Sequence, residues 1–591
     1  MVVLVWLLIY IPALFQPGLF DDADSVHAEA ARAMLLNHNW VTLYINGIRY
    51  LEKAPLMYWT VAASYKLFGV GEWQTRLPLS LGVLGLAWSA FIFGRRYFGG
   101  AAGFYGALIL VTASGIFVYT RFLIPDVLVA MWLTLGLYFF LIAYEQERPS
   151  RWLCWGIAAT IALNLLTKSL IAVVFPAMII GAFLLVTGSL LKILKFHLVS
   201  SSLVFLIVAA PWHVLAAIRP AQPTGPEKGF LWFYFVNEQC LRYLNKRIPY
   251  DYDKVPLLVF WVLLLAWLFP WCLHLFPSLR QVPARWRAWR DNLDSRGRAN
   301  LFCGIWAIVI MLFFSFSTRQ EYYSLPVLPP LALLIGNWLQ RESESPLGDR
   351  LRRAGQFSAA ALLVIGVLGF AAAMAILAKT HPFPPGTDIG AVLIPHPGAY
   401  KLSLGHMGDL TLESFGLFRR PLWLVGIGLL VGTALNWVLR RRGRALAANL
   451  SLAGMMIVVL FCVHDALVIF SSELSSKRIA LEIQQAYRPG ATIVINGKYD
   501  WGSTLNYYTG IQLHILNGRD GNLWFGSFFP DAPKIFEDDA SFARLWNSSS
   551  RVFLFSEDFL VDRALADIDR TKLFVFARQG GKVVLTNQPV P

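Results

Sequence analysis

The chain has 591 residues, of which 57% are hydrophobic and only 15% are charged. Soluble domains are usually about 45–50% apolar and about a quarter charged, so the excess apolar content indicates a protein that faces lipid. The net charge of +15 does not indicate a nucleic-acid surface, because the basic residues lie in short runs between hydrophobic segments.

Thirteen stretches are candidate membrane spans, since a span needs about 20 mostly apolar residues. They are 1–17, 76–96, 101–120, 123–145, 151–168, 170–188, 193–217, 254–276, 299–317, 323–340, 355–377, 420–438 and 446–470. The first stretch has no small-residue cleavage site after it, so we interpret it as a retained span rather than a signal peptide. The sequence therefore predicts an all-α polytopic membrane protein with about thirteen transmembrane helices.

The connections between these stretches alternate in charge. Basic runs occur at Arg95–Arg96, Arg148–Arg151, Lys192–Lys195, Arg280–Arg298, Arg341–Arg353 and Arg440–Arg444. Lys and Arg are enriched in cytoplasmic loops, and all six runs fall on one side when thirteen spans are counted. The pattern predicts a cytoplasmic N-terminus and an extracytoplasmic C-terminal region.

The outward side carries the longer connections and the polar tail. Its loops cover 18–75, 218–253 and 378–419. The tail alternates helix-like and strand-like runs, such as Arg478–Tyr487, Ala491–Ile495, Val552–Phe555 and Leu573–Ala577. We therefore expect a transmembrane domain over 1–470 and a small α/β domain over 471–591.

Three carboxylates open the first outward loop, where Asp21, Asp22 and Asp24 precede an Ala-rich run that continues to Leu35. An Asp at a helix start commonly caps free amide groups. A carboxylate at the outer mouth of a span can also act as a general base that removes a proton from an acceptor hydroxyl. Both interpretations stay open for each of these residues.

The same loop continues from Trp40 to Trp59, with Glu52 and Lys53 between aromatic and apolar neighbours. One interpretation is an interfacial helix over 56–68 with flanking charges and aromatic anchors. The other is that Lys53 contacts an anionic headgroup while Glu52 contacts a cation.

Several of these segments resemble one known family. The acidic cluster, the run Ala28–Leu35, the pair Asn39–Trp40 and the stretch Gly47–Trp59 are similar to the type C glycosyltransferases that use polyprenyl-phosphate sugars. Within that group the chain resembles the aminoarabinose transferases of lipid A and the protein O-mannosyltransferase-like enzymes. The resemblance implies a glycosyltransferase of the cell envelope in the bacterial inner membrane, with lipid A modification or protein mannosylation-like chemistry as its activity, and lipid A, another glycolipid and protein hydroxyls all stay open as acceptors.

The resemblance also implies two catalytic carboxylates. The family carries one Asp in the first outward loop, but an ungapped match places Ala23 at that position. Asp22 and Asp24 are therefore alternatives for this role. The second Asp of the family matches Asp126, which the predicted topology places near the outer membrane surface, where an ionisable residue needs exposure or a partner.

Zinc is the cofactor that the resemblance brings into consideration. In the aminoarabinose transferases a Glu that matches Glu52 binds zinc together with a His. Here the matching stretch is Asn237-Glu238-Gln239, and glutamine is a poor zinc ligand. His27 is a candidate substitute, although a lone His is more often a packing residue. The cofactor stays unassigned, with a divalent metal left open.

The remaining matches form a phosphate-binding set. The resemblance implies that Lys53 and Tyr323 contact the lipid phosphate, with Tyr322 an adjacent alternative. Further candidates are the cations Lys168, Arg242 and Arg319, which fall on the outward side. Each of them has the simpler alternative of anchoring a span end.

We thus expect an enzyme that moves a sugar from a polyprenyl-phosphate donor to a lipid or protein acceptor. Its other expected partners are membrane lipids, and we expect it to bind no nucleic acid. The sequence contains neither a Walker loop nor a GxGxxG motif that opens a helix after a strand, consistent with a donor that is already activated. The alternative is a polytopic transporter or flippase. Transporters usually show internal repeats and broken helices at the midplane, and we see no sequence repeat.

Overall fold

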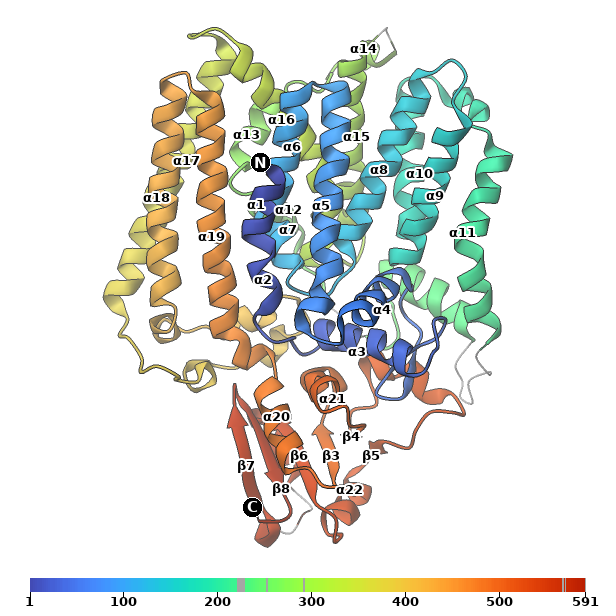
Figure 1. The fold of residues 1–591 in the computed structure, drawn as a ribbon, viewed down its shortest axis with the longest axis vertical. Coiled ribbons are helices and arrows are strands. Elements are labelled where there is room, and N and C mark those ends of the chain that lie inside the picture. Colours follow the sequence, from blue (N-terminus) through green and yellow to red (C-terminus); the bar gives the residue numbers. More distant parts are fainter. Residues whose placement is uncertain (220–228, 251–252, 291–292, 566–567, 569, 590–591) are drawn as a thin grey trace.

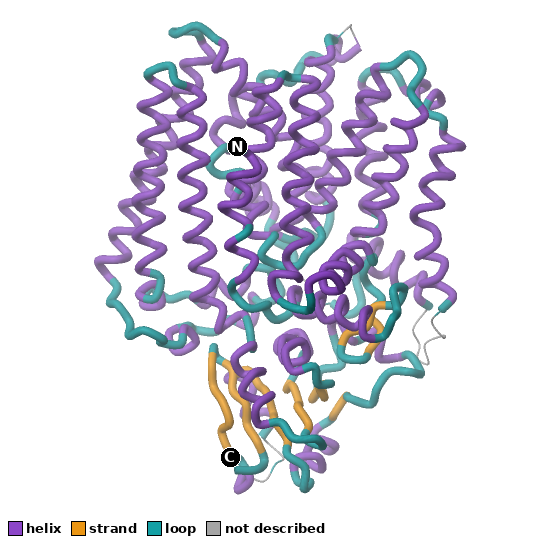
Figure 2. Tube along the Cα trace, viewed as in Figure 1, coloured by secondary structure: helices purple, strands orange, loops and turns teal. Residues whose placement is uncertain are grey.

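The computed structural model describes residues 1–219, 229–250, 253–290, 293–565, 568 and 570–589. A bundle of long helices makes up most of it, and a small sheet lies at one end of the bundle (Figure 1). Figure 2 shows that the strands are confined to this end. The fold therefore agrees with the predicted helical membrane protein that carries a C-terminal α/β region.

Helices occupy all thirteen positions that were predicted as spans. They are α1 (Val2–Tyr10), α2 (Pro12–Phe15), α5 (Glu72–Tyr97), α6 (Gly100–Thr112), α7 (Ser114–Tyr119), α8 (Asp126–Glu145), α9 (Arg151–Lys168), α10 (Ile171–Val186), α11 (Leu198–Ile218), α12 (Leu257–Trp267), α13 (Cys272–Leu279), α15 (Ser295–Ser315), α16 (Leu328–Glu344), α17 (Arg350–Lys379), α18 (Arg419–Arg441) and α19 (Ala445–Leu474). Three predicted spans are each a pair of shorter helices in the described residues: α1 with α2, α6 with α7, and α12 with α13.

Within the described residues, seven helices are long and apolar enough to cross a membrane by themselves. An eighth span results if α12 and α13, which meet at a bend of 100°, are counted together. The apolar helices α6, α10 and α1 with α2 are shorter. The protein is thus a multi-pass membrane protein, while the count of thirteen spans stays a prediction.

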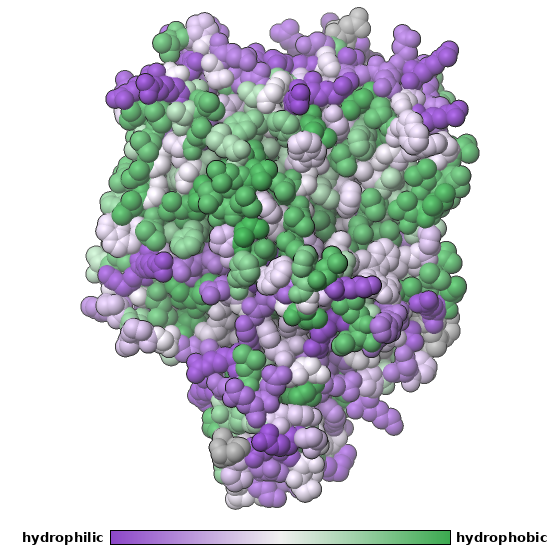
Figure 3. All heavy atoms as spheres, in the orientation of Figure 1, coloured by the Kyte–Doolittle hydropathy of each residue, from purple (hydrophilic) through white to green (hydrophobic). Residues whose placement is uncertain are grey.

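The two ends of the bundle differ in what they carry. The basic connections lie at the end opposite the C-terminal sheet, among them the turn between α18 and α19 and the segment around α14 (Trp286–Arg290) (Figure 1). Figure 3 shows a broad apolar band between two hydrophilic ends. This one-sided distribution of the basic loops agrees with the sequence pattern and with the positive-inside rule.

Small residues set the closest helix contacts. A Cβ on Gly103 of α6 would lie 2.5 Å from the backbone oxygen of Phe91 in α5. A Cβ on Gly336 of α16 would lie 2.5 Å from the backbone oxygen of Ala102. Because lipid tails are as apolar as side chains, close packing of this kind is a main source of helix association in membranes.

Short elements cover the end of the bundle next to the sheet, which we call the outward end because the basic loops lie at the opposite end. They are α3 (Ala23–Leu36), β1 (Leu43–Ile45), β2 (Ile48–Tyr50), α4 (Leu56–Phe68), the π-helical segment η2 (Trp232–Leu241) and the 3-10 turns η3 (Glu321–Val327), η4 (Ile389–Val392), η5 (Pro397–Ala399), η6 (Gly405–Asp409) and η7 (Glu413–Gly416). The 3-10 segment η1 (Leu190–Lys195) belongs to the basic loops. The helix expected over 56–68 is α4, so this prediction is confirmed in its bounds.

The tail folds into a mixed six-stranded sheet with short helices. Its strands are β3 (Thr492–Asn496), β4 (Leu513–Leu516), β5 (Phe536–Glu537), β6 (Val552–Glu557), β7 (Phe574–Gln579) and β8 (Lys582–Thr586), in the order β5-β4-β3-β6-β8-β7. Its helical elements are α20 (Lys477–Ala486), α21 (Ser503–Thr509), α22 (Asp539–Trp546), α23 (Val561–Ala564) and the turns η8 (Tyr499–Gly502), η9 (Gly521–Leu523), η10 (Phe525–Phe528), η11 (Asp558–Leu560) and η12 (Arg570–Lys572). The first four strands in this order pair in parallel, β8 pairs antiparallel with β6, and β7 pairs antiparallel with β8. The helix and strands expected from the alternating runs lie within a residue or two of these bounds.

The sheet is attached to the outward loops by specific contacts. The side chain of Asn46, in the β1–β2 turn, donates to the Leu513 carbonyl at 2.9 Å and accepts from the Leu513 N–H at 2.8 Å. The ring of Phe525 stacks on Phe233 of η2 at 3.7 Å between centroids. The tail therefore packs on the same loops that form the outer end of the bundle.

Candidate active site

A cavity of about 450 Å³ lies at the outward end of the bundle. It is lined by the segment before α4, the start of α8, the end of α9, the segment η2, the end of α15 and the start of η3. Seven of the residues singled out in the sequence lie in its wall: Glu52, Lys53, Asp126, Lys168, Arg242, Tyr322 and Tyr323. Residues from distant parts of the chain thus meet where the resemblance implied a sugar-phosphate site.

Asp126 and Lys168 form the tightest ion pair of this wall. Asp126 is the first residue of α8 and Lys168 the last of α9, where their charges complement the helix dipoles. The Lys168 ammonium donates to both carboxylate oxygens of Asp126 at 2.6 Å. It also lies 5.0 Å and 5.1 Å from the ring centroids of Tyr322 and Tyr323. The lysine therefore links a buried carboxylate to two aromatic faces.

A second network surrounds Glu52. Its carboxylate lies 3.2 Å from the Lys53 ammonium and 3.4 Å from the guanidinium of Arg247. Arg247 also contacts Glu238 at 2.7 Å, and Arg242 lies 3.6 Å from the same carboxylate. The side chains of Glu52, Glu238 and Arg247 are all at most 4% exposed. Arg247 is thus a buried cation shared by two buried carboxylates.

These residues do not fit the zinc site that the family resemblance raised. A zinc ion needs several deprotonated ligands that converge on one point. Glu52 already faces two cationic side chains, and the neighbouring residue in η2 is Gln239. The guanidinium of Arg247 stands between the two carboxylates that an ion would have to share. We therefore derive no step through a metal in this cavity.

His27 lines the cavity as well, but both of its ring nitrogens are occupied. Nδ1 lies 2.6 Å from the Leu123 carbonyl and Nε2 lies 3.3 Å from the Tyr50 hydroxyl. Burial, together with the positive charge of Lys53, lowers the pKa of His27 to about 3. A neutral imidazole held at both nitrogens packs against the cavity wall, which matches the simpler interpretation made from the sequence.

The two candidate carboxylates at the start of α3 lie elsewhere. The Asp24 side chain is buried and accepts from the backbone N–H of Leu123 at 2.6 Å and from Arg76 at 3.5 Å. Asp22 is the N-cap residue of α3 with a positive φ of 62°, and its N–H donates to the Ser503 hydroxyl at 2.9 Å. Neither residue is among the described residues that line the cavity. Asp22 faces the tail, whereas Asp24 joins α3 to the loop before α8.

Arg319 is also outside the cavity wall in the described part of the chain. Its guanidinium donates to the carbonyls of Val255, Ser315 and Ser317 at 2.8–3.2 Å. It thus holds the turn between α15 and η3 in place. This is the anchoring role that the sequence left as the alternative.

Sequence reasoning missed Arg247 and left Glu238 without a role. The two residues are nine positions apart, a separation that matches neither helical nor strand periodicity. The contact forms because the chain turns back after η2, where the Asn237 side chain holds the backbone of Ile248 through bonds of 2.8 and 2.9 Å. No local pattern identifies such a pairing.

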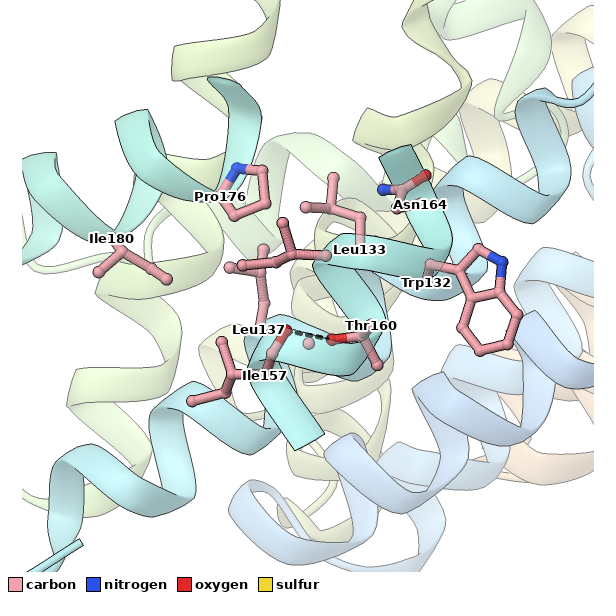
Figure 4. A pocket seen from close by; sticks show the side chains of 10 residues that line it. Trp132, Leu133, Leu137, Ile157, Thr160, Asn164, Pro176 and Ile180 are labelled. Carbon is pink, nitrogen blue, oxygen red and sulfur yellow. Dashed lines mark hydrogen bonds between the residues drawn. The ribbon is translucent and has the colours of Figure 1, made fainter. Parts of the chain in front are cut away.

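A second hollow, between α8, α9 and α10, is shown in Figure 4. Its volume is only about 10 Å³, which is about enough for one water molecule. Thr160, one of the polar residues in its wall, donates to the Ile157 carbonyl within its own helix. This hollow has no room for a ligand, so the outward cavity remains the candidate site.

Comparisons with known proteins find chains similar to this one. The family described as dolichyl-phosphate-mannose-protein mannosyltransferase matches residues 52–214. The undecaprenyl phosphate-alpha-4-amino-4-deoxy-L-arabinose arabinosyl transferase of Erwinia tasmaniensis is 26% identical over 562 residues, covering 93% of this chain and 90% of the relative. The crystal structure of ArnT from Cupriavidus metallidurans bound to undecaprenyl phosphate superposes with a TM-score of 0.78 at 24% identity, covering 99% and 97% of the two chains.

This chain has the type C glycosyltransferase fold. A second transferase of the same description, from Pseudomonas fluorescens, is 27% identical over 59% of each chain. The resemblance stated from the sequence motifs is therefore confirmed, and so is the predicted enzyme class, a glycosyltransferase. The family match begins at Glu52 and includes Lys53, Asp126 and Lys168.

Proposed function

We propose that this glycosyltransferase moves a sugar from a polyprenyl-phosphate donor to a lipid or protein acceptor at the outer face of the membrane. The observation that carries the proposal is the outward cavity, which brings Asp126 together with Lys53, Lys168 and Arg242. The four residues come from four different segments, so their convergence depends on the fold and not on any local sequence pattern.

The charges of the cavity suit a phosphate. Three cations, Lys53, Lys168 and Arg242, and three carboxylates, Glu52, Asp126 and Glu238, line the wall. Arg247 lies behind the wall within ion-pair distance of two of these carboxylates, so the site as a whole has a cationic surplus. Fixed positive charge of this kind stabilises the phosphate as it leaves with its negative charge. Tyr322 and Tyr323 complete the proposed phosphate-binding set.

One side of the cavity suits a polyprenyl chain. Leu170, Ile171 and Val174 from the start of α10, with Phe313 and Phe314 from the end of α15, line it there. Both helices reach into the apolar band of the bundle. A lipid-linked phosphate would therefore place its headgroup among the cations while its tail lies along apolar side chains.

The proposed chemical step uses Asp126 as the general base. An acceptor hydroxyl attacks the anomeric carbon, its proton passes to the Asp126 carboxylate, and the bond from that carbon to the phosphate oxygen breaks. The electron pair leaves with the polyprenyl phosphate. Lys168, which contacts Asp126 at 2.6 Å in the absence of substrate, is positioned to orient the carboxylate and to face the departing phosphate.

Asp22 and Asp24 stay alternative carboxylates for this reaction, and their surroundings suggest a direct test. Asp24→Asn removes the charge that faces Arg76 and the Leu123 N–H, so we expect lower thermal stability but unchanged transfer per folded molecule. Asp22→Asn is its matched comparison at the start of the same helix. A loss of transfer in either variant, with full stability, would assign the catalytic role to that residue instead of Asp126.

The names of the relatives indicate which donor sugar to test first. Two of them are described as transferring 4-amino-4-deoxy-L-arabinose from undecaprenyl phosphate. We take this sugar as the first to test, with other pentoses and hexoses on the same lipid phosphate as the next. The acceptor class, a lipid such as lipid A or a protein hydroxyl, is open to the same assay.

The arrangement in the membrane is part of the proposal. We infer a bacterial inner-membrane protein with thirteen spans, a cytoplasmic N-terminus, a transmembrane domain over 1–470 and an extracytoplasmic domain over 471–591. The position of the basic loops at the end opposite the tail supports this orientation. A reporter enzyme that works only on the extracytoplasmic side should therefore be active when it is fused after Pro591.

The test uses membranes that contain the chain and undecaprenyl phosphate carrying radiolabelled 4-amino-4-deoxy-L-arabinose. We expect label to pass to an envelope acceptor, and mass spectrometry of envelope lipids with and without the protein identifies the product. Asp126→Asn should lower the transfer rate by about 10²–10⁴-fold, the usual contribution of a general base. Lys53→Ala should also reduce transfer strongly.

Lys66→Ala is the matched control, because Lys66 is an exposed lysine on the neighbouring helix α4. It should transfer sugar as the parent does. Full activity in both Lys53→Ala and Asp126→Asn would overturn the proposed site. Movement of the labelled lipid between leaflets without any labelled acceptor would favour the transporter alternative.

A further inference from the structure

A second polar cluster lies outside the cavity, where the loop 380–418 meets the end of α19. We call it the outer junction and define it by His406 and Asp409 of η6 and Glu473 of α19. Asp409 is 1% exposed and Glu473 is 7% exposed. These two carboxylates come from segments more than 60 residues apart, and His406 lies between them.

The distances in the outer junction resemble those between ligands of one metal ion. The Nδ1 atom of His406 lies 3.5 Å from a carboxylate oxygen of Asp409 and 3.5 Å from one of Glu473. The three ligand atoms all lie within 4.8 Å of one another. Two ligands that each bind zinc at about 2.0–2.1 Å in a tetrahedron are about 3.3 Å apart. A small closure around an ion would satisfy all three.

The ligand atoms are held in place by a supporting layer. The carboxylate of Asp409 accepts the backbone N–H of His396 at 2.7 Å and the Tyr400 hydroxyl at 2.8 Å. The Tyr400 ring stacks on the His406 ring, with centroids 3.9 Å apart and planes at 20°. Hydrogen bonds and packing that orient ligands in this way are typical of metal sites.

One atom of the cluster is left unsatisfied. Nδ1 of His406 is buried and has no hydrogen-bond partner among the residues that the structure describes. It points at two carboxylate oxygens that lie just beyond hydrogen-bond distance. A buried polar atom without a partner is costly, and a cation between the three atoms would satisfy it.

Carboxylates outnumber fixed cations here. The buried ammonium of Lys582 lies 3.0 Å from Asp21 and also interacts with Glu473 and Glu557, so one lysine is shared by three carboxylates. His396, whose Nδ1 atom lies 3.4 Å from Asp409, is more than half exposed. Buried carboxylates normally have a paired cation or a bound metal, so the outer junction has the charge pattern of a cation site.

We propose that His406, Asp409 and Glu473 bind one divalent transition-metal ion, with His396 near enough to serve as a fourth ligand. One or two imidazoles with two carboxylates are a ligand set that suits zinc better than calcium or magnesium, which prefer oxygen ligands alone.

The site would connect the tail, the loop and the cavity wall. On one side, Asp388 of the same loop accepts from Gly580 in the β7–β8 turn at 2.6 Å and from Ser472 of α19 at 3.0 Å. On the other side, the backbone N–H of Leu404 donates to Glu321 at 3.3 Å, next to Tyr322 of the cavity. An ion in the outer junction would thus stabilise the loop that supports the tyrosine end of the cavity.

The experiment measures zinc alone, on the purified full-length chain in detergent. The protein is treated with a chelator, loaded with ZnCl₂, desalted and analysed for zinc per chain, and its affinity is measured by competition with a chromophoric chelator. We expect about one tightly bound zinc and a higher melting temperature with zinc, since a ligand that binds only the folded state stabilises it. His406→Ala and Glu473→Gln should each weaken binding by about tenfold or more.

Two control variants locate the ion. His381→Ala removes an exposed imidazole from the same outward loop, and Glu52→Gln removes the carboxylate that the family resemblance assigns to zinc in the cavity. Both should retain the parent affinity for zinc. The readout needs no sugar transfer, so it is independent of the proposed function.

Three outcomes would overturn the proposal. They are a parent chain that retains no zinc, variants of His406 and Glu473 that bind zinc as the parent does, and loss of zinc in Glu52→Gln alone. Size-exclusion chromatography confirms that each variant is folded. Glu473→Gln keeps the side-chain size, so it serves as the test if His406→Ala fails to fold.

Discussion

The cavity and the outer junction both gather buried carboxylates from distant segments, but they differ in the cations that face them. In the cavity every carboxylate has a fixed basic partner: Asp126 has Lys168, Glu52 has Lys53 and Arg247, and Glu238 has Arg242 and Arg247. In the outer junction the ion-pair partner that Asp409 and Glu473 share is an imidazole, and the Lys582 ammonium that also interacts with Glu473 is shared with Asp21 and Glu557.

The difference indicates two solutions to the same physical problem. A buried carboxylate must have a compensating charge, which the chain can supply from its own side chains or acquire from solution. Where lysines and arginines of the chain itself compensate the carboxylates, the same basic side chains can also bind an anionic substrate. A site with imidazole and carboxylate ligands is suited to a metal ion. The following experiments test this distinction.

The largest effect on stability is expected for Arg247→Met. The substitution leaves Glu52 and Glu238 buried without their shared cation, and breaking a buried ion pair costs about 3–5 kcal/mol. We expect a clear drop in the melting temperature of the purified protein. Arg353→Met, at an exposed arginine in the basic loops, is the control and should melt as the parent does. Equal stability of the two variants would show that Arg247 is not needed to compensate the carboxylates.

A pH series tests whether a basic partner is sufficient for a buried carboxylate. Glu29 of α3 lies 2.6 Å from Arg32, yet burial outweighs that attraction and raises the pKa of Glu29 to about 7. A carboxylate whose pKa rises on folding stabilises the folded state below its unfolded pKa of about 4.3, and this contribution is lost as the pH rises through about 7.

The measurement compares melting temperatures of the parent and Glu29→Gln from pH 4 to pH 8. The parent should lose stability relative to the variant as the pH rises, by about 3 kcal/mol in all, because one pKa unit corresponds to about 1.36 kcal/mol. Glu413→Gln, at an exposed position, should follow the parent. A constant difference across this range would contradict the shifted pKa.

The smallest effect is expected for Gln239→His. This substitution restores the histidine that the family resemblance implies next to Glu52, yet the guanidinium of Arg247 still lies between Glu52 and Glu238. We expect the zinc content per chain to stay that of the parent. An additional equivalent of zinc that disappears on Glu52→Gln would show that the cavity differs from a metal site by this one residue only.

The helical fold was predictable because its causes are local. A run of about 20 apolar residues must form a helix in lipid, since every backbone polar group needs a partner there. The strands at 492–496 and 552–557 follow from short β-branched and aromatic runs. The pairing order of the sheet and the 100° bend between α12 and α13 could not be predicted from the sequence, because both depend on contacts between distant segments.

The site was predictable only in part. The resemblance pointed to Lys53, Asp126 and Lys168, which the fold brings to one cavity. It also pointed to Arg319, which instead holds backbone carbonyls, and it left Arg247 unmentioned. A basic side chain contacts a phosphate in one place and anchors a turn in another, and the sequence alone does not distinguish the two.

The sequence by itself determined the class of the protein, its helical segments and the sidedness of its basic loops, because hydrophobicity and charge act residue by residue. Only the tertiary structure decided which carboxylates share a cation and which meet a histidine. Those choices depend on distances between segments that are tens to hundreds of residues apart, as for Glu52 with Arg247 and Asp409 with Glu473. Electrostatic energy falls with distance in space, so chain separation gives no measure of it.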